Sequence, residues 1–159
     1  MRLATLMPLC ALVGCTVVQL YLMRAGFTSF SFDGALYTRS LWGIAHGDWY
    51  NALRDQHALA LHSHYVLVLL APLARLFGAH TVLLVAQGIA LMAYLLVLRW
   101  AVFRVLGQRW VAWLVFSALA LNPLMLNGFV AGVRPMTFTL APLLYAAVRL
   151  LIDRRAGLS

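Results

Sequence analysis

The chain of 159 residues contains neither lysine nor glutamate, and charged residues of any kind are scarce. They make up 10% of the chain, well below the average of about 25% in soluble proteins. Hydrophobic residues make up 64%. This composition excludes a soluble globular domain and predicts an all-α integral membrane protein, because long apolar runs cross a bilayer as helices.

Cysteine is almost absent, and both copies, Cys10 and Cys15, lie in the first apolar run. A disulfide is excluded because residues five apart point to different sides of a helix. The sequence LVGC, which ends at Cys15, resembles a lipoprotein cleavage box. The apolar run continues beyond it to about twenty residues, however, which is the length of a span rather than of a signal peptide. Packing is therefore favoured over lipidation of Cys15.

Acidic residues are too few to balance the arginines, which leaves a net charge of +8. All twelve bases are arginine, and the four acids are Asp33, Asp48, Asp55 and Asp153. The arginines are spread between apolar runs and form no patch suited to a phosphate backbone, so nucleic acid is excluded as a partner. Membrane topology explains their positions better.

Four apolar segments are long enough to cross a membrane, which takes about twenty residues. They are residues 3–23, 81–103, 110–126 and 136–152. A fifth segment, 64–78, is shorter and contains Pro72 and Arg75. Whether this fifth segment crosses decides the topology of the chain.

The arginines between the segments test the two topologies, because short cytoplasmic loops are rich in arginine. If residues 64–78 do not cross, every basic cluster is cytoplasmic, including the turn with Arg99, Arg104 and Arg109. If they do cross, that turn and the basic tail fall outside, against the rule. We therefore expect cytoplasmic N- and C-termini, and a helix over residues 64–78 that lies along the outer membrane surface or is re-entrant.

Three of the four aspartates fall in the first outer loop, which lies between residues 24 and 64. Asp33 and Gly34 precede apolar residues at spacings of three and four, which predicts an amphipathic surface helix over residues 34–47. Asp33 is placed to cap this helix. The sequence predicts a single membrane domain, 1–159, whose outer loop carries two surface helices.

Four stretches of the chain resemble the N-terminal half of the GT-C membrane glycosyltransferases, which use polyprenyl-phosphate-linked sugars. The chain is closer still to an uncharacterised family of bacterial polytopic membrane proteins related to those enzymes. The stretches are FDGALYTRSLWGIAHG (32–47), HSHYVLVLLAPLARLFG (62–78), LLVAQGIALMAYLLVLR (83–99) and LNPLMLNGFVAGVRP (121–135).

The resemblance implies a catalytic role for Asp33, as general base or as organiser of a metal site. It implies that Arg134 meets a lipid phosphate, for which a guanidinium offers two parallel donors. Arg39, His62 and His64 would lie around Asp33 as substrate-binding residues. His57, His62 and His64, with Asp55, form a second candidate metal cluster, but their spacing matches no known zinc motif, so no metal ligands are assigned. The cofactor is unknown, and a divalent metal is a candidate.

Two departures from the transferase pattern leave the function open. Many relatives carry an acid just after the Arg-Pro of the second outer loop, or a His-Pro-acid sequence there, where this chain has Met136 and Thr137. The transferases also continue through several further spans, so either the chain is a partial or reduced member, or its active site is completed elsewhere. The leading hypothesis is a protein of the bacterial inner membrane that handles a polyprenyl-phosphate-linked sugar at the outer face. The alternative is a non-enzymatic membrane subunit that binds a larger partner membrane protein.

Overall fold

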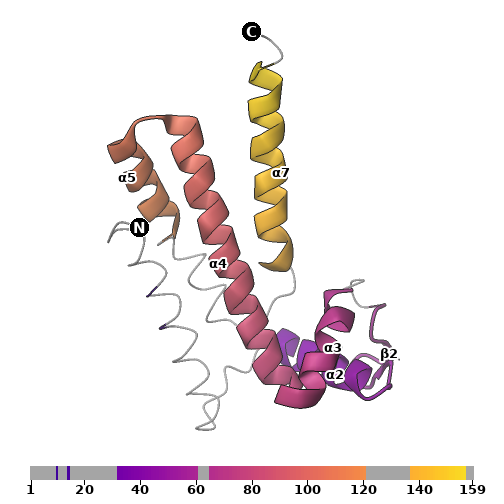
Figure 1. Ribbon diagram of the computed structural model, residues 1–159. Helices are drawn as coiled ribbons and strands as arrows, with labels where there is room; N and C mark the ends of the chain where they lie inside the picture. Colours follow the sequence, from indigo (N-terminus) through magenta and orange to yellow (C-terminus); the bar gives the residue numbers. More distant parts are fainter. Residues whose placement is uncertain (1–9, 11–13, 15–31, 61–64, 121–136, 157–159) are drawn as a thin grey trace.

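The structure, a computed structural model, describes Cys10, Gly14 and residues 32–60, 65–120 and 137–156. This part of the chain is almost entirely helical (Figure 1). Its elements are α2 (Phe32–Ala45), β1 (Tyr50–Asn51), β2 (Gln56–His57), α3 (Val66–Phe77), α4 (Ala79–Leu106), α5 (Arg109–Ala120) and α7 (Thr137–Ala156). The expected helices over 34–47 and 64–78 correspond to α2 and α3. The expected span 3–23 lies outside the described residues, apart from Cys10 and Gly14.

The strands β1 and β2 form a short antiparallel hairpin, in which Tyr50 pairs with His57 and Asn51 with Gln56. The all-α prediction missed this hairpin. Two residue pairs give no recognisable period in the sequence, and such a hairpin depends on contacts with the rest of the fold. It follows directly after α2 and contacts that helix.

Helix α4 is the long axis of the molecule and has 28 residues, or about 42 Å at 1.5 Å per residue. It is the one helix of the described residues that is long and apolar enough to cross a membrane. Helices α3, α5 and the apolar part of α7 are shorter. The structure thus supplies one candidate span for the segment expected at 81–103. Where spans were expected at 110–126 and 136–152, it describes the helices α5 (Arg109–Ala120) and α7 (Thr137–Ala156), whose apolar parts are shorter.

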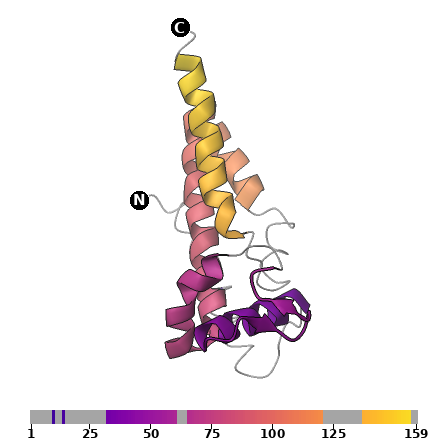
Figure 2. The same ribbon diagram turned by 90° about the vertical axis from the view of Figure 1, so that its right-hand side faces the viewer.

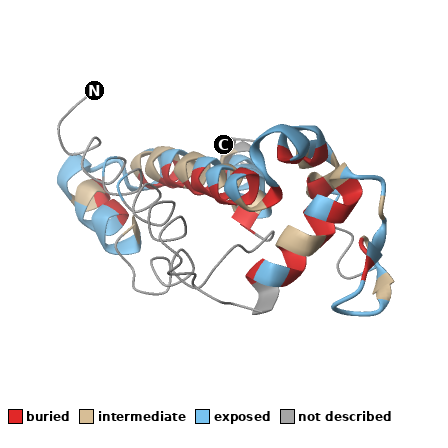
Figure 3. Ribbon diagram, turned by 90° about the horizontal axis from the view of Figure 1, so that it is seen from below, coloured by how far each residue is buried: buried red, intermediate tan, exposed pale blue. Residues whose placement is uncertain are grey.

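One side of α4 is buried along its length, and the opposite side is exposed (Figure 3). The buried residues recur at alternating spacings of four and three, as in a helix that packs against parallel or antiparallel neighbours. This series comprises Leu84, Gly88, Leu91, Leu95, Leu98 and Val102. Ile89, on the outward side, is 62% exposed. An apolar outward side suits contact with lipid.

Helices α4 and α7 run in the same direction, and α5 runs back alongside α4 (Figure 1). The C-terminal ends of α4 and α7 and the N-terminal end of α5 therefore lie at one end of the molecule. We call this end the basic end, because it carries Arg99, Arg104, Arg109 and Arg149. Helix α2, the hairpin and α3 lie at the other end, where α2 crosses the axis of α4 (Figure 2).

Apolar side chains form one cluster at each end. Near the start of α4, Leu41 of α2, Leu67 of α3 and Leu83 of α4 are at most 1% exposed and belong to one core. Near its C-terminal end, Leu95 and Leu98 pack with Ala112 and Phe116 of α5. The first core holds α2 and α3 rigidly on α4.

A single residue, Gly78, joins α3 to α4 and has φ +85°. Side chains other than glycine rarely adopt this left-handed conformation. Gly78 thus allows the chain to reverse direction sharply between a helix that lies against α2 and the long helix α4. We use the name loop module for α2, the hairpin and α3.

Candidate functional site

Asp33 lies in the first turn of α2, since the helix begins at Phe32. The expected N-cap position is therefore off by at least one residue. A carboxylate in the first turn is still favoured by the helix dipole. The Asp33 side chain is outside the described part of the structure.

Arg39 of α2 contacts the turn that follows this helix. Its Nη2 donates to Oδ2 of Asp48 at 3.0 Å, and its guanidinium carbon lies 4.8 Å from the centre of the Trp42 ring. Asp48 also accepts a hydrogen bond from the Tyr50 backbone N–H at 3.0 Å. On a regular helix, positions 33 and 39 differ by about 9 Å along the axis and about 120° around it.

Gly43 allows the turn after α2 to pack closely. A Cβ atom at this position would lie 2.5 Å from the backbone oxygen of Asp48. The Asp48 N–H donates to the Gly43 carbonyl at 2.8 Å. Only a residue without a side chain permits this approach, so Gly43 sets where Asp48 meets Arg39.

A buried amide joins the hairpin to α2. Asn51 is fully buried and donates from Nδ2 to the Leu36 carbonyl at 3.2 Å and to Oγ of Ser40 at 2.6 Å. Its Oδ1 accepts from the Leu53 N–H at 3.0 Å. The side chain thus satisfies groups on two elements in a place that water does not reach.

A second link joins α2 to the first turn of α4. Thr38 Oγ1 and His80 Nδ1 are 3.0 Å apart. Sequence reasoning assigned neither residue a role. The available signal was His80 itself, a titratable residue placed directly after the helix-breaking Gly78 and at the start of an apolar run.

The histidine cluster considered from sequence is only partly within the described residues. His57 stacks on Trp49 with ring centres 5.7 Å apart and accepts from the Leu59 N–H at 3.2 Å. Asp55 accepts a hydrogen bond from the Tyr50 hydroxyl, which raises the pKa of that phenol above its usual value. In the part of the chain that the structure describes, no three potential ligands come together for a metal ion. Local partners therefore account for His57 and Asp55.

Three of the expected substrate-binding residues, His62, His64 and Arg134, lie outside the described residues. The structure places Asp33 and Arg39 on α2, and how they lie relative to the other three is outside what it describes. Asp48 and Asp55, the acids with described side chains, both have protein partners.

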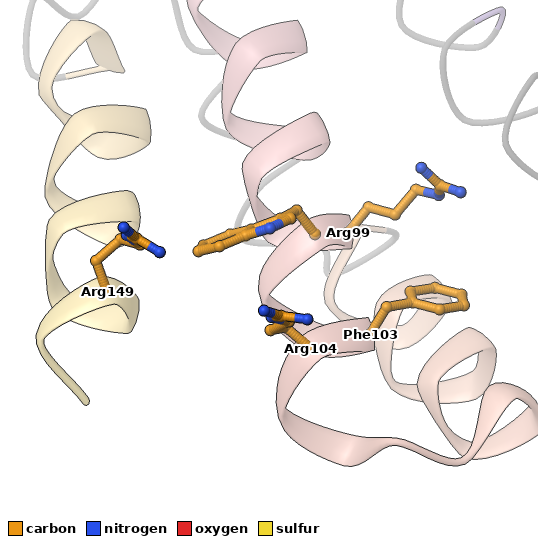
Figure 4. A pocket seen from close by; sticks show the side chains of 5 residues that line it. Arg99, Phe103, Arg104 and Arg149 are labelled. Carbon is orange, nitrogen blue, oxygen red and sulfur yellow. The ribbon is translucent and has the colours of Figure 1, made fainter. Parts of the chain in front are cut away.

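A pocket of about 380 Å³ lies between α4 and α7 at the basic end. It is lined by Arg99, Trp100, Phe103, Arg104 and Arg149 (Figure 4). Sequence reasoning used these arginines only as markers of topology. The parallel packing of α4 and α7 brings Arg149 close to residues 45 to 50 positions earlier in the chain.

A family model described as Predicted membrane protein (DUF2079) matches residues 25–157, which is most of the chain. Neither the curated proteins nor the solved structures gave a match. The description supports the expectation of a membrane protein and specifies no activity, so the relation to glycosyltransferases stays a prediction. The matched range includes every helix from α2 to α7, and the chain belongs to the predicted membrane protein family DUF2079.

Proposed function

We propose that the chain handles a polyprenyl-phosphate-linked sugar at the outer face of the bacterial inner membrane, with Asp33 as the catalytic carboxylate. In this proposal the chain crosses the membrane four times, at residues 3–23, 81–103, 110–126 and 136–152. Both termini are cytoplasmic, and the loop module lies outside. Arg39, His62, His64 and Arg134 bind the substrate around Asp33. The observation that carries the proposal is the placement of Asp33 in the loop module, at the end of α4 opposite the arginines.

The charge distribution supports this orientation. Four described arginines gather at the basic end. The loop module carries Arg39, Arg54 and Arg75 together with the acids Asp48 and Asp55, and Arg39 is paired with Asp48. Arginines near the ends of spans favour the cytoplasm, which would leave the loop module on the outer side.

The exposed side of α3 supports a position at the membrane surface. Leu67, Ala71 and Ala74 are buried against the module and α4. Apart from Arg75, the exposed residues of α3 are apolar as well; four of them have exposed fractions of 47–77%: Leu69, Leu73, Leu76 and Phe77. Lipid acyl chains at the interface would cover this outward side, as they do for interfacial helices.

The chemistry asked of Asp33 is modest. A carboxylate at the membrane surface can accept the proton of an acceptor hydroxyl as its oxygen attacks the sugar carbon and the bond to the lipid phosphate breaks. The phosphate leaves as an anion on its polyprenyl carrier. Alternatively, the same carboxylate could hold a divalent metal, which would stabilise that leaving group.

The Asp33→Asn variant tests the proposal. It keeps the size and hydrogen-bonding capacity of the side chain but removes the base. Membranes that contain the variant and a radiolabelled polyprenyl-phosphate-linked sugar should transfer label about 100-fold more slowly, the usual minimum for loss of a general base. Asp55→Asn is the matched control, because Asp55 is an exposed partner of Tyr50 in the same module. Wild-type transfer by Asp33→Asn would refute the role of the carboxylate.

A non-enzymatic subunit of a larger membrane complex is the second candidate. Among the residues that the structure describes, Arg39 is already paired with a protein carboxylate, which favours a structural use of the loop module. The exposed apolar residues of α7, Leu143, Leu150 and Leu151, offer a contact side for another span. This function predicts a partner that stays bound in mild detergent and no effect of Asp33→Asn. Native mass spectrometry of the complex extracted from its own membrane separates the two functions, since it detects bound protein and bound polyprenyl phosphate together.

A further inference from the structure

The pocket at the basic end lies at the depth where a bilayer changes from acyl chains to headgroups. The first 20 residues of α4, from Ala79 to Leu98, contain no arginine or aspartate and span about 30 Å. This length equals the thickness of the hydrocarbon core. Arg99 follows immediately, so a membrane crossed by α4 has its phosphate groups beside Arg99 and Arg104.

Positive charge in the pocket is not neutralised by the described side chains. No acid of the described residues lines the pocket, and the ion pair between Arg39 and Asp48 lies at the opposite end of α4. Asp153, the remaining acid of α7, has a side chain outside the described residues. Three guanidinium groups that share one pocket repel each other, and an anion among them would offset this repulsion.

The arginines divide into two groups within the pocket (Figure 4). Arg149 extends from α7 toward α4, and Arg104 lies on the α4 side of the same space. Arg99 extends away from α7, where its guanidinium carbon is 5.4 Å from the ring centre of Phe103 and 5.8 Å from that of Trp113. Its Nε is buried and has no hydrogen-bond partner among the described groups. Arg99 is thus held by aromatic rings, while Arg104 and Arg149 are available to a ligand.

Trp100 gives the pocket an aromatic wall between the two helices. Its ring centre is 5.2 Å from that of Tyr145 on α7. Tryptophan and tyrosine favour the headgroup region, where an apolar ring meets polar groups. Guanidinium N–H donors beside an aromatic ring suit the phosphate of a phospholipid, whose glycerol group carries the acyl chains.

We propose that Arg104 and Arg149 bind the phosphate of an anionic phospholipid from the leaflet at the basic end, with Trp100 beside its glycerol group. Arg99 contributes its charge and fixes the aromatic side of the pocket. The site is independent of the proposed glycosyl transfer, because it lies at the other end of α4 and uses none of the residues around Asp33. The bound lipid fastens α7 to α4 at their C-terminal ends.

Lipid retention by the full-length protein tests this proposal. Protein purified in mild detergent is mixed with phosphatidylglycerol or with zwitterionic phosphatidylcholine of the same chain length, and retained lipid is measured by native mass spectrometry. The wild type should retain phosphatidylglycerol preferentially. Arg104→Gln and Arg149→Gln should each weaken retention about fivefold, the effect of one basic residue near an anionic surface. The double variant should weaken retention more than either single variant. The lysine variants should weaken it less, since they keep the charge and lose the fork.

Arg109→Gln is the matched control. Arg109 is an exposed arginine at the same end of the molecule that does not line the pocket. Its removal should change retention less than twofold. Equal retention of both lipids, unchanged retention in the double variant, or an equal loss in Arg109→Gln would overturn the site. Displacement of the lipid by an equal concentration of inorganic phosphate would identify a site for soluble anions and would overturn the lipid assignment.

Discussion

Replacing Asn51 by alanine should detach the hairpin from α2 locally without unfolding α4. The side chain is completely buried and makes three hydrogen bonds, to Leu36, Ser40 and Leu53. A buried hydrogen bond contributes about 1 kcal/mol net, and the groups left behind in Asn51→Ala would find no water to replace it. The expected loss of local stability is therefore about 3 kcal/mol.

Amide hydrogen exchange measures this local opening directly. The Ala58 N–H donates to the Trp49 carbonyl at 2.6 Å across the base of the hairpin, so its exchange reports whether the hairpin is closed. A loss of about 3 kcal/mol corresponds to roughly a hundredfold faster exchange at Ala58. Amides in the middle of α4 should be unaffected.

Ser40→Ala is the companion variant, because it removes one of the three partners and keeps the amide. Its effect should be near 1 kcal/mol, and the double variant should be less unstable than the sum of the two single variants. An increase below threefold at Ala58 in Asn51→Ala would mean that the buried amide does not hold the hairpin, and the reasoning would fail.

Two further predictions concern the turn and the hairpin. Gly43→Ala should destabilise the loop module by about 1–3 kcal/mol, since its Cβ would lie 2.5 Å from the Asp48 backbone oxygen. Thermal unfolding should show a lower midpoint for this variant. Gly14→Ala is the control: a Cβ at Gly14 would meet no atom within 4 Å, so this variant should unfold at or above the wild-type temperature. The raised pKa of Tyr50 means that its contact with Asp55 is fully present below the ordinary phenol pKa of about 10 and is lost as the pH rises through the folded value. Ultraviolet titration should therefore find the Tyr50 phenol ionising at lower pH in Asp55→Asn, and an unchanged midpoint would exclude the carboxylate as the cause.

The helices around Gly78 could be predicted from the sequence to within a few residues. Residues 64–78 and 81–103 are apolar runs separated by a helix-breaking residue, and the structure has α3 and α4 at these places. Such runs are defined by local composition, which a sequence displays directly. Glycine at a left-handed φ then fixes the boundary between them.

The contacts between distant residues could not be predicted in the same way. Asn51 reads as an ordinary turn residue, and only the packing of the hairpin on α2 makes it a buried donor to Ser40. Arg104 and Arg149 lie 45 positions apart, and the parallel arrangement of α4 and α7 brings them to one pocket. Propensity and periodicity describe single elements, whereas these sites arise from how elements pack.

The one-residue connection at Gly78 makes the loop module follow the orientation of α4. No linker absorbs movement between α3 and α4, and the contact between Thr38 and His80 fastens α2 to the same first turn. Helix α4 is about 42 Å long, more than a hydrocarbon core of about 30 Å, and helices longer than the core they cross tilt by an amount that depends on bilayer thickness. In the proposed orientation, a thinner membrane would increase the tilt of α4 and turn the whole loop module with it. The height of the loop module relative to the headgroups would then depend on the thickness of the surrounding bilayer.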